Sequence, residues 1–333
     1  MVAETHLRAI TGSDIVKFQG LLGRDFERAE SYLKASVAEE KVYRSISELC
    51  NDGEIDFAIL TTPPNARMPI LRRLVQAGIP VLMEKPIERT LAAAQAIADL
   101  HDAADIPAGI VFQHRARKSS QALKAMVSDG LIGDLVAGEI RVPWWRDQSY
   151  YDAPGRGTYQ RDGGGVMINQ AIHMLDIAVW IMGPVTSVSA TMATTLMHSM
   201  EAENWAGGVL QFASGAMATL MATTSFYPGG AESIRIQGTK AHAHLEGGIL
   251  TVSYLDGQTQ VIGNSSDGSG GGADPMAFNH IWHQRVIEDF AECVQNGRPP
   301  LCSVRDGLQV HSVIDAMERS SRARHVMDLA SHD

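Results

Sequence analysis

The stretch Ile79-Pro80-Val81-Leu82-Met83-Glu84-Lys85-Pro86 decides the fold. Its first five residues form a short apolar run after a glycine turn, which is typical of a fully buried parallel strand. Pro86 ends such a strand because proline cannot donate a ladder hydrogen bond. Ligands of open α/β sheets gather at the carboxyl ends of the strands. The sequence therefore predicts that Lys85 lies at a ligand site, although an isolated lysine at a strand end is more often a surface residue.

Short apolar runs and helical patterns alternate on both sides of this strand. Further strands are expected at 15–22, 41–43, 56–60 and 108–112, and helices at 25–35, 45–50, 65–77 and 90–104. Strands that alternate with helices of this length indicate an α/β protein with a doubly wound parallel sheet.

The pattern changes after residue 113. Helices are expected at 119–128, 167–182, 279–295 and 304–320, and strands at 136–142, 187–194, 205–212, 216–223, 233–237, 242–246 and 250–254. The strands follow one another at hairpin spacing, which predicts a second α/β domain with an open, mainly antiparallel sheet. We therefore expect domains at 1–113 and 114–333. The glycine- and serine-rich run 265–272 is expected to be a flexible loop.

Composition limits the classes of partner. The 333 residues carry a formal net charge of −10, which argues against nucleic acid or an anionic membrane as the main partner. The three cysteines are far apart and match no metal or redox spacing. No apolar run approaches the roughly 20 residues of a membrane span, and the first residues show no signal-peptide region. The sequence predicts a cytoplasmic protein with reduced thiols.

Six motifs occur together in a specific order. They are Thr62-Pro63-Pro64-Asn65, Glu84-Lys85-Pro86, Phe112-Gln113-His114-Arg115, Val142-Pro143-Trp144-Trp145-Arg146, the run from Gly163 to Asp176, and Gly238-Thr239-Lys240. In this order they resemble the glucose–fructose oxidoreductase / inositol dehydrogenase / rhizopine-catabolism (Gfo/Idh/MocA) family. The resemblance implies a Rossmann domain followed by an α/β domain with an open antiparallel sheet. It also implies oxidation or reduction of a hydroxyl carbon of a sugar or cyclitol with NAD or NADP.

The chain departs from the family at its beginning. The family opens with a strand and a glycine-rich turn, whereas residues 1–10 resemble the helix that follows that turn, with Ala3 in the third small-residue position. A missing central strand leaves peptide groups of its neighbours unpaired, at about 1–3 kcal/mol each. We therefore expect an N-terminally incomplete Rossmann-type sheet, in a chain that starts at an internal methionine of a longer protein.

A second departure concerns the cofactor. NAD-preferring relatives carry an acidic residue at the end of the second strand, where this chain has Gly23 followed by Arg24 and Asp25. A guanidinium there favours the 2′-phosphate of NADP over NAD. In the alternative interpretation Arg24 belongs to a surface loop and Asp25 starts a helix. The residues expected at the cofactor are Ala3, Arg24, Asp25, Thr62, Pro63, Asn65, Glu84, Lys85 and Gln113.

The resemblance implies that Lys85 contacts the reacting hydroxyl and the cofactor, and that His173 is the other acid/base group. Asn169 lies four residues before His173, so both are expected on one helix face. An amide can orient a hydroxyl but cannot take its proton, which leaves proton transfer to His173 and Lys85. In the alternative, His173 is a core histidine bonded to a backbone carbonyl. Asp176, three residues further on, is a candidate to hold the imidazole.

An aromatic and basic loop, together with nearby arginines, is the candidate substrate surface. The resemblance and the composition of the loop predict substrate contacts from Arg115, Trp145, Arg146, Tyr151, Asn169 and His173. Arg156 and Arg161 add positive charge, which would suit an acidic or phosphorylated sugar. The alternative interpretation is an interdomain packing loop.

Three further interpretations complete the prediction. The pairs His242/His244 and His280/His283 lack a clear third ligand, so no metal is predicted. The exposed face of an open sheet favours association, which predicts a homodimer or homotetramer through this face. The expected substrate, as the resemblance implies, is a small sugar or cyclitol. Two other classes are open: a glycosidase or lyase that uses NAD for transient oxidation, and a non-catalytic dinucleotide or sugar sensor.

Overall fold

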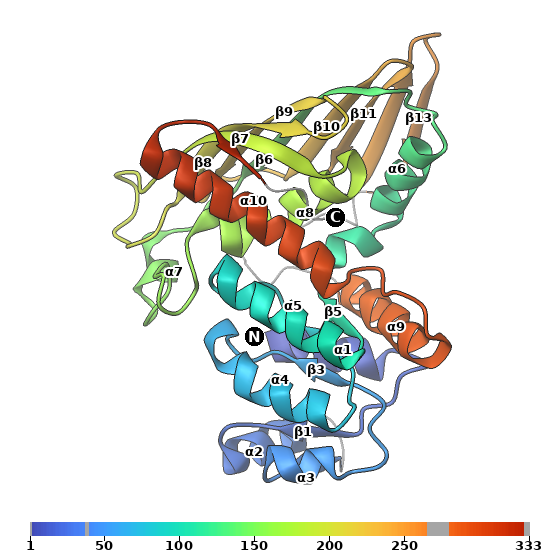
Figure 1. Ribbon diagram of the computed structural model, residues 1–333, viewed down its shortest axis with the longest axis vertical. Helices are drawn as coiled ribbons and strands as arrows, with labels where there is room; N and C mark the ends of the chain where they lie inside the picture. The colour runs from blue at the N-terminus through green and yellow to red at the C-terminus, as the bar shows by residue number, and fades with distance from the viewer. Residues whose placement is uncertain (1, 37–39, 265–279, 330–333) are drawn as a thin grey trace.

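The computed structural model describes residues 2–36, 40–264 and 280–329 (Figure 1). The predicted loop at 265–272 lies outside these residues. Parallel strands occupy one end of the molecule and a large sheet the other, with the long helices α5 and α10 between them (Figure 1).

The first part alternates strands and helices, as the sequence predicts. Its elements are α1 (Val2–Thr11), β1 (Gly20–Leu22), α2 (Phe26–Ser36), β2 (Lys41–Tyr43), α3 (Ile46–Cys50), β3 (Ala58–Leu60), η1 (Pro64–Ala66), α4 (Arg67–Gln76), β4 (Val81–Met83), α5 (Leu91–Ala104) and β5 (Ala108–Ile110). Strand β4 lies between β3 and β5, all three run parallel, and its three residues are buried. The decisive stretch is therefore the central strand of its sheet.

Strand β1 differs from the expectation. The predicted strand at 15–22 is reduced to Gly20–Leu22, which pairs only with β2 among the described residues and forms a separate two-stranded sheet. Val16 and Phe18 instead pack against a small apolar cluster that includes Phe290. Their apolar character reflects this packing rather than a ladder, because periodicity alone does not distinguish the two.

The second part holds a nine-stranded sheet in the order β13-β12-β11-β10-β6-β9-β8-β7-β14. The strands are β6 (Leu135–Pro143), β7 (Val185–Ala193), β8 (Trp205–Phe212), β9 (Met217–Thr223), β10 (Ser233–Gly238), β11 (Ala241–Glu246), β12 (Ile249–Tyr254), β13 (Thr259–Ile262) and β14 (Met327–Asp328). All neighbours are antiparallel except β6 and β9, which confirms the mainly antiparallel sheet. The sequence missed β13 and β14, because both are short and largely exposed at the sheet edges.

Helices cover one face of this sheet. They include α6 (Lys118–Ser128), α8 (Ile172–Met182) and α10 (Val304–Ala323), while α9 (Ile281–Asn296) packs on α1 (Figure 1). Because α10 also packs on α5, the end of the chain touches both parts. The division at residue 113 therefore stays a prediction. The carboxyl end of β4 lies beside the turn that precedes α8, since Lys85 contacts Asn169.

Candidate active site

Lys85 occupies the predicted position at the carboxyl end of β4. Its Nζ donates a hydrogen bond to the main-chain carbonyl of Asn169, at 2.8 Å. Desolvation lowers the pKa of the Lys85 ammonium, and the neighbouring Glu84 carboxylate partly opposes this shift. A lysine with a lowered pKa exchanges protons more readily near neutral pH, as an acid/base group must.

A π-helical turn explains this contact. The helix expected from residue 167 begins as a π-helix over Met167–Ala171 and becomes α-helical only at Ile172. The sequence predicted a regular helix face for Asn169 and His173, and this detail was wrong. Single π-turns re-aim backbone groups and occur often at functional sites. Here the re-aimed group is the Asn169 carbonyl that accepts from Lys85.

The Asn169 side chain faces the glycine turn. Its Nδ2 donates to the carbonyls of Gly164 and Gly165, at 2.9 and 3.0 Å. Both amide hydrogens are thus engaged, so any contact of the side chain with a substrate would have to use Oδ1. The structure supports a role for Asn169 in shaping the turn, whereas its predicted contact with substrate stays a prediction.

His173 lies buried beside Lys85, with 6 % of its surface exposed. Its ring stacks on His114, with ring centroids 4.7 Å apart, and meets Phe112 edge-on. Nδ1 of His173 has no hydrogen-bond partner in the described part of the chain. Burial holds the pKa of His173 well below its ordinary value, and the Lys85 ammonium adds to the effect. The imidazole is therefore neutral at pH 7 and able to accept a proton.

Two predicted roles need correction. Asp176 does not hold His173, because its carboxylate accepts from Nε and Nη2 of Arg115, at 2.7–3.1 Å. Arg115 is 2 % exposed and also contacts the Leu301 carbonyl and Asp306. A buried charge requires a partner of opposite sign. Arg115 is therefore a core residue, and the prediction that it binds substrate was wrong.

The aromatic and basic loop packs largely on itself. Arg146 is buried against the Trp144 ring, and the hydroxyl of Tyr151 lies 2.6 Å from Thr224 Oγ1. Trp145 is half-buried and contacts Tyr227 edge-on. The packing interpretation thus describes Arg146 and Tyr151, while Trp145 keeps an accessible face.

Another arginine of this segment influences the site. Arg156 and Asp162 act electrostatically on Lys85 from the loop that precedes the glycine run. The positive charge of Arg156, which the sequence suggested for an acidic sugar, therefore contributes to the lowered pKa of Lys85.

Arg67 is a structural residue that the sequence did not reveal. Its guanidinium is 1 % exposed and donates to the carbonyls of Thr62, Glu84, Pro86 and Ile87. One side chain thus ties the loop after β3 to the turn after β4. The sequence contained an indication of this role. Arg67 lies on the helix face that also carries Leu71 and Leu74, and a buried guanidinium on such a face requires hydrogen-bond acceptors nearby.

Two predicted cofactor residues, Thr62 and Gln113, and the neighbouring His114 leave polar atoms unpaired. Within the described residues, Thr62 Oγ1, Gln113 Oε1 and both ring nitrogens of His114 are buried and lack hydrogen-bond partners. Buried polar groups normally have partners, and each exception in a structure needs an explanation. A flat polar ligand such as the nicotinamide carboxamide would supply these partners, so the residues fit a dinucleotide.

The remaining predicted cofactor residues fall into two sets. Ala3 lies on α1, and the exposed Pro63 and Asn65 lie at the start of and within η1. Glu84 is already engaged, because Oε1 accepts from His6 Nε2 at 2.8 Å and Oε2 accepts from the Lys85 amide. Glu84 therefore anchors the turn, and a direct contact with the cofactor stays a prediction.

His6, Glu84 and His283 form a buried group whose potential ligand atoms all lie within 4.8 Å of one another. Metal-bound histidines nearly always donate their second ring N–H to an acceptor. Nδ1 of His6 and of His283 have no partner among the described residues. A metal would leave two buried N–H groups unpaired, so the geometry favours the His6–Glu84 hydrogen bond, and no metal is assigned.

A parallel sheet with a lysine at the end of its central strand, a neutral histidine on the facing helix α8 and a large, mainly antiparallel sheet together define the class: a dinucleotide-binding oxidoreductase. Family models agree. Residues 1–108 match the oxidoreductase family with an NAD-binding Rossmann fold, and residues 120–244 match the GFO/IDH/MocA C-terminal domain. Because the two models describe the N- and C-terminal domains of one family, the chain belongs to the Gfo/Idh/MocA oxidoreductases.

Individual relatives are distant but similar along most of their length. D-apiose dehydrogenase of Paraburkholderia graminis is 25 % identical, over 99 % of this chain and 87 % of its own. Myo-inositol 2-dehydrogenase of Thermotoga maritima is 25 % identical, over 83 % of this chain and 80 % of its own. The structure of the WlbA dehydrogenase of Bordetella pertussis, in complex with NADH and UDP-GlcNAcA, superposes with a TM-score of 0.84 at 25 % identity, covering 99 % of this chain and 95 % of that one.

No helix in the described ranges is long and apolar enough to cross a membrane.

Proposed function

We propose that the protein transfers a hydride between a nicotinamide cofactor and a secondary hydroxyl or keto carbon of a sugar, sugar derivative or cyclitol. The observation that carries the proposal is the position of Lys85 at the end of β4, where a dinucleotide-binding sheet presents its ligand, with its Nζ bonded to the Asn169 carbonyl and neutral His173 following in the first turn of α8. The relatives that act on apiose and inositol support the same chemistry.

The chain's own residues supply binding and proton transfer. A bound nicotinamide provides the hydride acceptor or donor. Lys85, fixed by the Asn169 carbonyl, orients the oxygen of the reacting carbon with its ammonium group. His173 takes the hydroxyl proton on its imidazole, which burial keeps neutral, and returns it in the reverse direction. The aromatic face of Trp145 would lie against the ring of the substrate.

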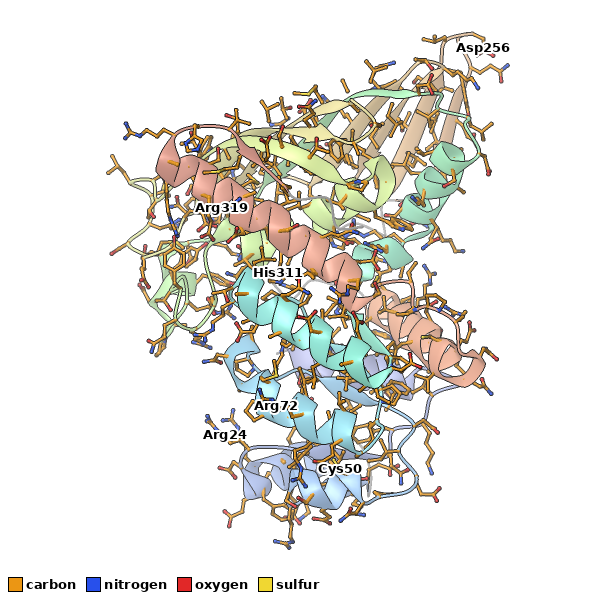
Figure 2. The ribbon with its side chains drawn as sticks, viewed as in Figure 1. Arg24, Cys50, Arg72, Asp256, His311 and Arg319 are labelled. Carbon is orange, nitrogen blue, oxygen red and sulfur yellow. The ribbon has the colours of Figure 1, made fainter. Side chains whose placement is uncertain are left out.

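NADP rather than NAD is the proposed cofactor. Gly23 provides no carboxylate for the ribose hydroxyls, and Arg24 is exposed and projects from the ribbon after β1 (Figure 2). Asp25 accepts a hydrogen bond from the Arg28 amide at 3.0 Å, so it starts α2, as the alternative interpretation has it. The Asp25 carboxylate is thus engaged with the first turn of α2, and the guanidinium of Arg24 is the group of residues 23–25 suited to a 2′-phosphate.

Titration with NADPH and NADH, followed by the fluorescence of the reduced nicotinamide, tests both statements. We expect binding of both, tighter for NADPH, and a preference that disappears in Arg24→Ala. A screen of sugars and cyclitols then follows cofactor reduction, with Lys85→Ala as the inactive control. Failure to bind either nucleotide would refute the proposal.

Two other classes predict different results in the same assays. A glycosidase or lyase that uses transient oxidation would turn over its substrate without releasing reduced cofactor. A sensor would bind nucleotide or sugar without any turnover. The neutral base at His173 favours the dehydrogenase over the sensor.

We also propose a homodimer through the open face of the nine-stranded sheet. The side chains of Trp205, Val209, Met217 and Met221 point to this face, which the helices leave uncovered. Val209 and Met217 are 40 % and 44 % exposed, and apolar surface of this kind favours association.

A further inference from the structure

Glu203 is a buried carboxylate outside every motif of the sequence. It lies just before β8 and is 5 % exposed. Its Oε2 accepts from the Gly165 amide at 3.0 Å, and its Oε1 accepts from the Met167 amide at 3.1 Å. Its main-chain carbonyl accepts from the Val166 amide at 2.8 Å. The amides of three successive residues, 165–167, thus donate hydrogen bonds to Glu203.

These N–H groups open the helix that carries the candidate catalytic groups. The first N–H groups of a helix lack partners within the helix, and an adjacent side chain normally satisfies them. The π-turn that precedes α8 has no such capping side chain of its own. Glu203 supplies this function from 36–38 residues away.

The approach of Glu203 also explains a glycine. A Cβ at Gly165 would lie 1.7 Å from the Glu203 carbonyl oxygen, which real contacts never allow. Any other residue at 165 would push the turn away from Glu203 and break the hydrogen bonds between them.

The same turn fixes both candidate catalytic groups. The carbonyl of Gly165, whose amide Glu203 holds, accepts from Asn169 Nδ2. The Asn169 carbonyl in turn accepts from Lys85 Nζ, and His173 follows in the first turn of α8. Hydrogen bonds through Gly165 and Asn169 therefore connect Glu203 to Lys85.

We propose that Glu203 is a positioning residue for the dehydrogenase reaction, whose carboxylate holds residues 165–167 so that Lys85 and His173 keep their relative geometry. The proposal rests on the proposed function. Glu203 itself touches neither Lys85 nor His173 in the contacts described above, so it acts through the turn.

The charge of Glu203 makes this role measurable. Burial raises the pKa of Glu203 to about 7, the Glu318 carboxylate on α10 adds to the rise, and the amides of Met167 and Gly165 oppose it. Tyr151 and Tyr159 also interact electrostatically with it. An ionised carboxylate accepts two N–H groups better than a protonated one. How the turn is held should therefore change as Glu203 ionises near pH 7, and because burial raises this pKa, the ionisation lowers the free energy of unfolding as the pH rises.

The test compares Glu203→Gln with Glu201→Gln, the same change at an exposed position two residues away. In Glu203→Gln we expect kcat to fall at least about tenfold, which corresponds to one charge-assisted hydrogen bond. KM for the cofactor should change less than about twofold, and the pH dependence of kcat near 7 should lose one ionisation. The control should match the wild type. Glu203→Asp serves if the glutamine variant does not fold.

Amide hydrogen exchange of the cofactor-free protein gives a second measurement that does not require turnover. Exchange at residues 165–167 should accelerate in Glu203→Gln and stay unchanged in the control. Faster exchange throughout the molecule, or unchanged kcat with unchanged local exchange, would overturn the proposal. If the wild type shows no dehydrogenase activity, the proposed function fails, and the local exchange alone then decides whether Glu203 holds the turn.

Discussion

Replacement of Arg67 by lysine should loosen both loops beside the cofactor. The guanidinium donates to four main-chain carbonyls, those of Thr62, Glu84, Pro86 and Ile87, and is almost completely buried. Burial lowers its pKa to about 10, yet it stays charged at pH 7. A lysine keeps the charge but presents three donors from one point, so it cannot reach acceptors spread around a planar group.

The magnitude follows from the number of bonds. Loss of two or three hydrogen bonds, at about 1 kcal/mol each, should reduce the free energy of unfolding by about 2–3 kcal/mol. The midpoint of thermal unfolding should fall by about 4–12 °C, on the basis of about 2–4 °C per kcal/mol. Because Thr62 and Lys85 belong to the two loops, Kd for the reduced cofactor should also rise.

Urea unfolding and fluorescence titration measure the two effects. Arg72→Lys is the matched control, since Arg72 lies on the same helix but is exposed (Figure 2). It should change neither quantity. An Arg67→Lys variant with a free energy of unfolding within about 0.5 kcal/mol of the wild type and an unchanged Kd would refute the reasoning.

The remaining predictions concern three other positions. His173→Gln should lower kcat/KM by about 10²–10⁴-fold while cofactor binding is retained. In the wild type, kcat/KM should rise with pH through a pKa below the ordinary histidine value and stay flat near pH 7. A midpoint of this rise at or above the ordinary histidine pKa would contradict the neutral base. Asp176→Asn should reduce the free energy of unfolding by about 3 kcal/mol, because it leaves the Arg115 guanidinium without its main buried partner. In urea unfolding, a loss no greater than in the half-buried surface control Asp315→Asn would contradict this. Met217→Glu should convert the proposed dimer to a monomer in light scattering, because an unpaired carboxylate is costly to bury; an unchanged mass would place the interface elsewhere.

The sequence predicted the order and type of the main elements because each short apolar run has a period and length that suit only a few environments. Strand β4 shows this: three buried residues bounded by a glycine turn and a proline. The predicted strand at 15–22 shows the limit, because an apolar run that packs against a distant helix has the same pattern as a strand. The position of Lys85 at a strand end was likewise readable from the local sequence.

The partners of the charged and polar side chains came only from the tertiary structure. Arg115 pairs with Asp176 across 61 positions, and Lys85 reaches the Asn169 carbonyl across 84. A resemblance names the residues of a site, but which acceptor each donor finds depends on how the elements pack. The sequence by itself determined an oxidoreductase fold, and its resemblance to the family predicted a lysine and a histidine for the chemistry. Only the packing of β4, the π-turn and Glu203 decided how these groups are held, because hydrogen bonds act over about 3 Å and the chain brings such distant atoms together only when folded.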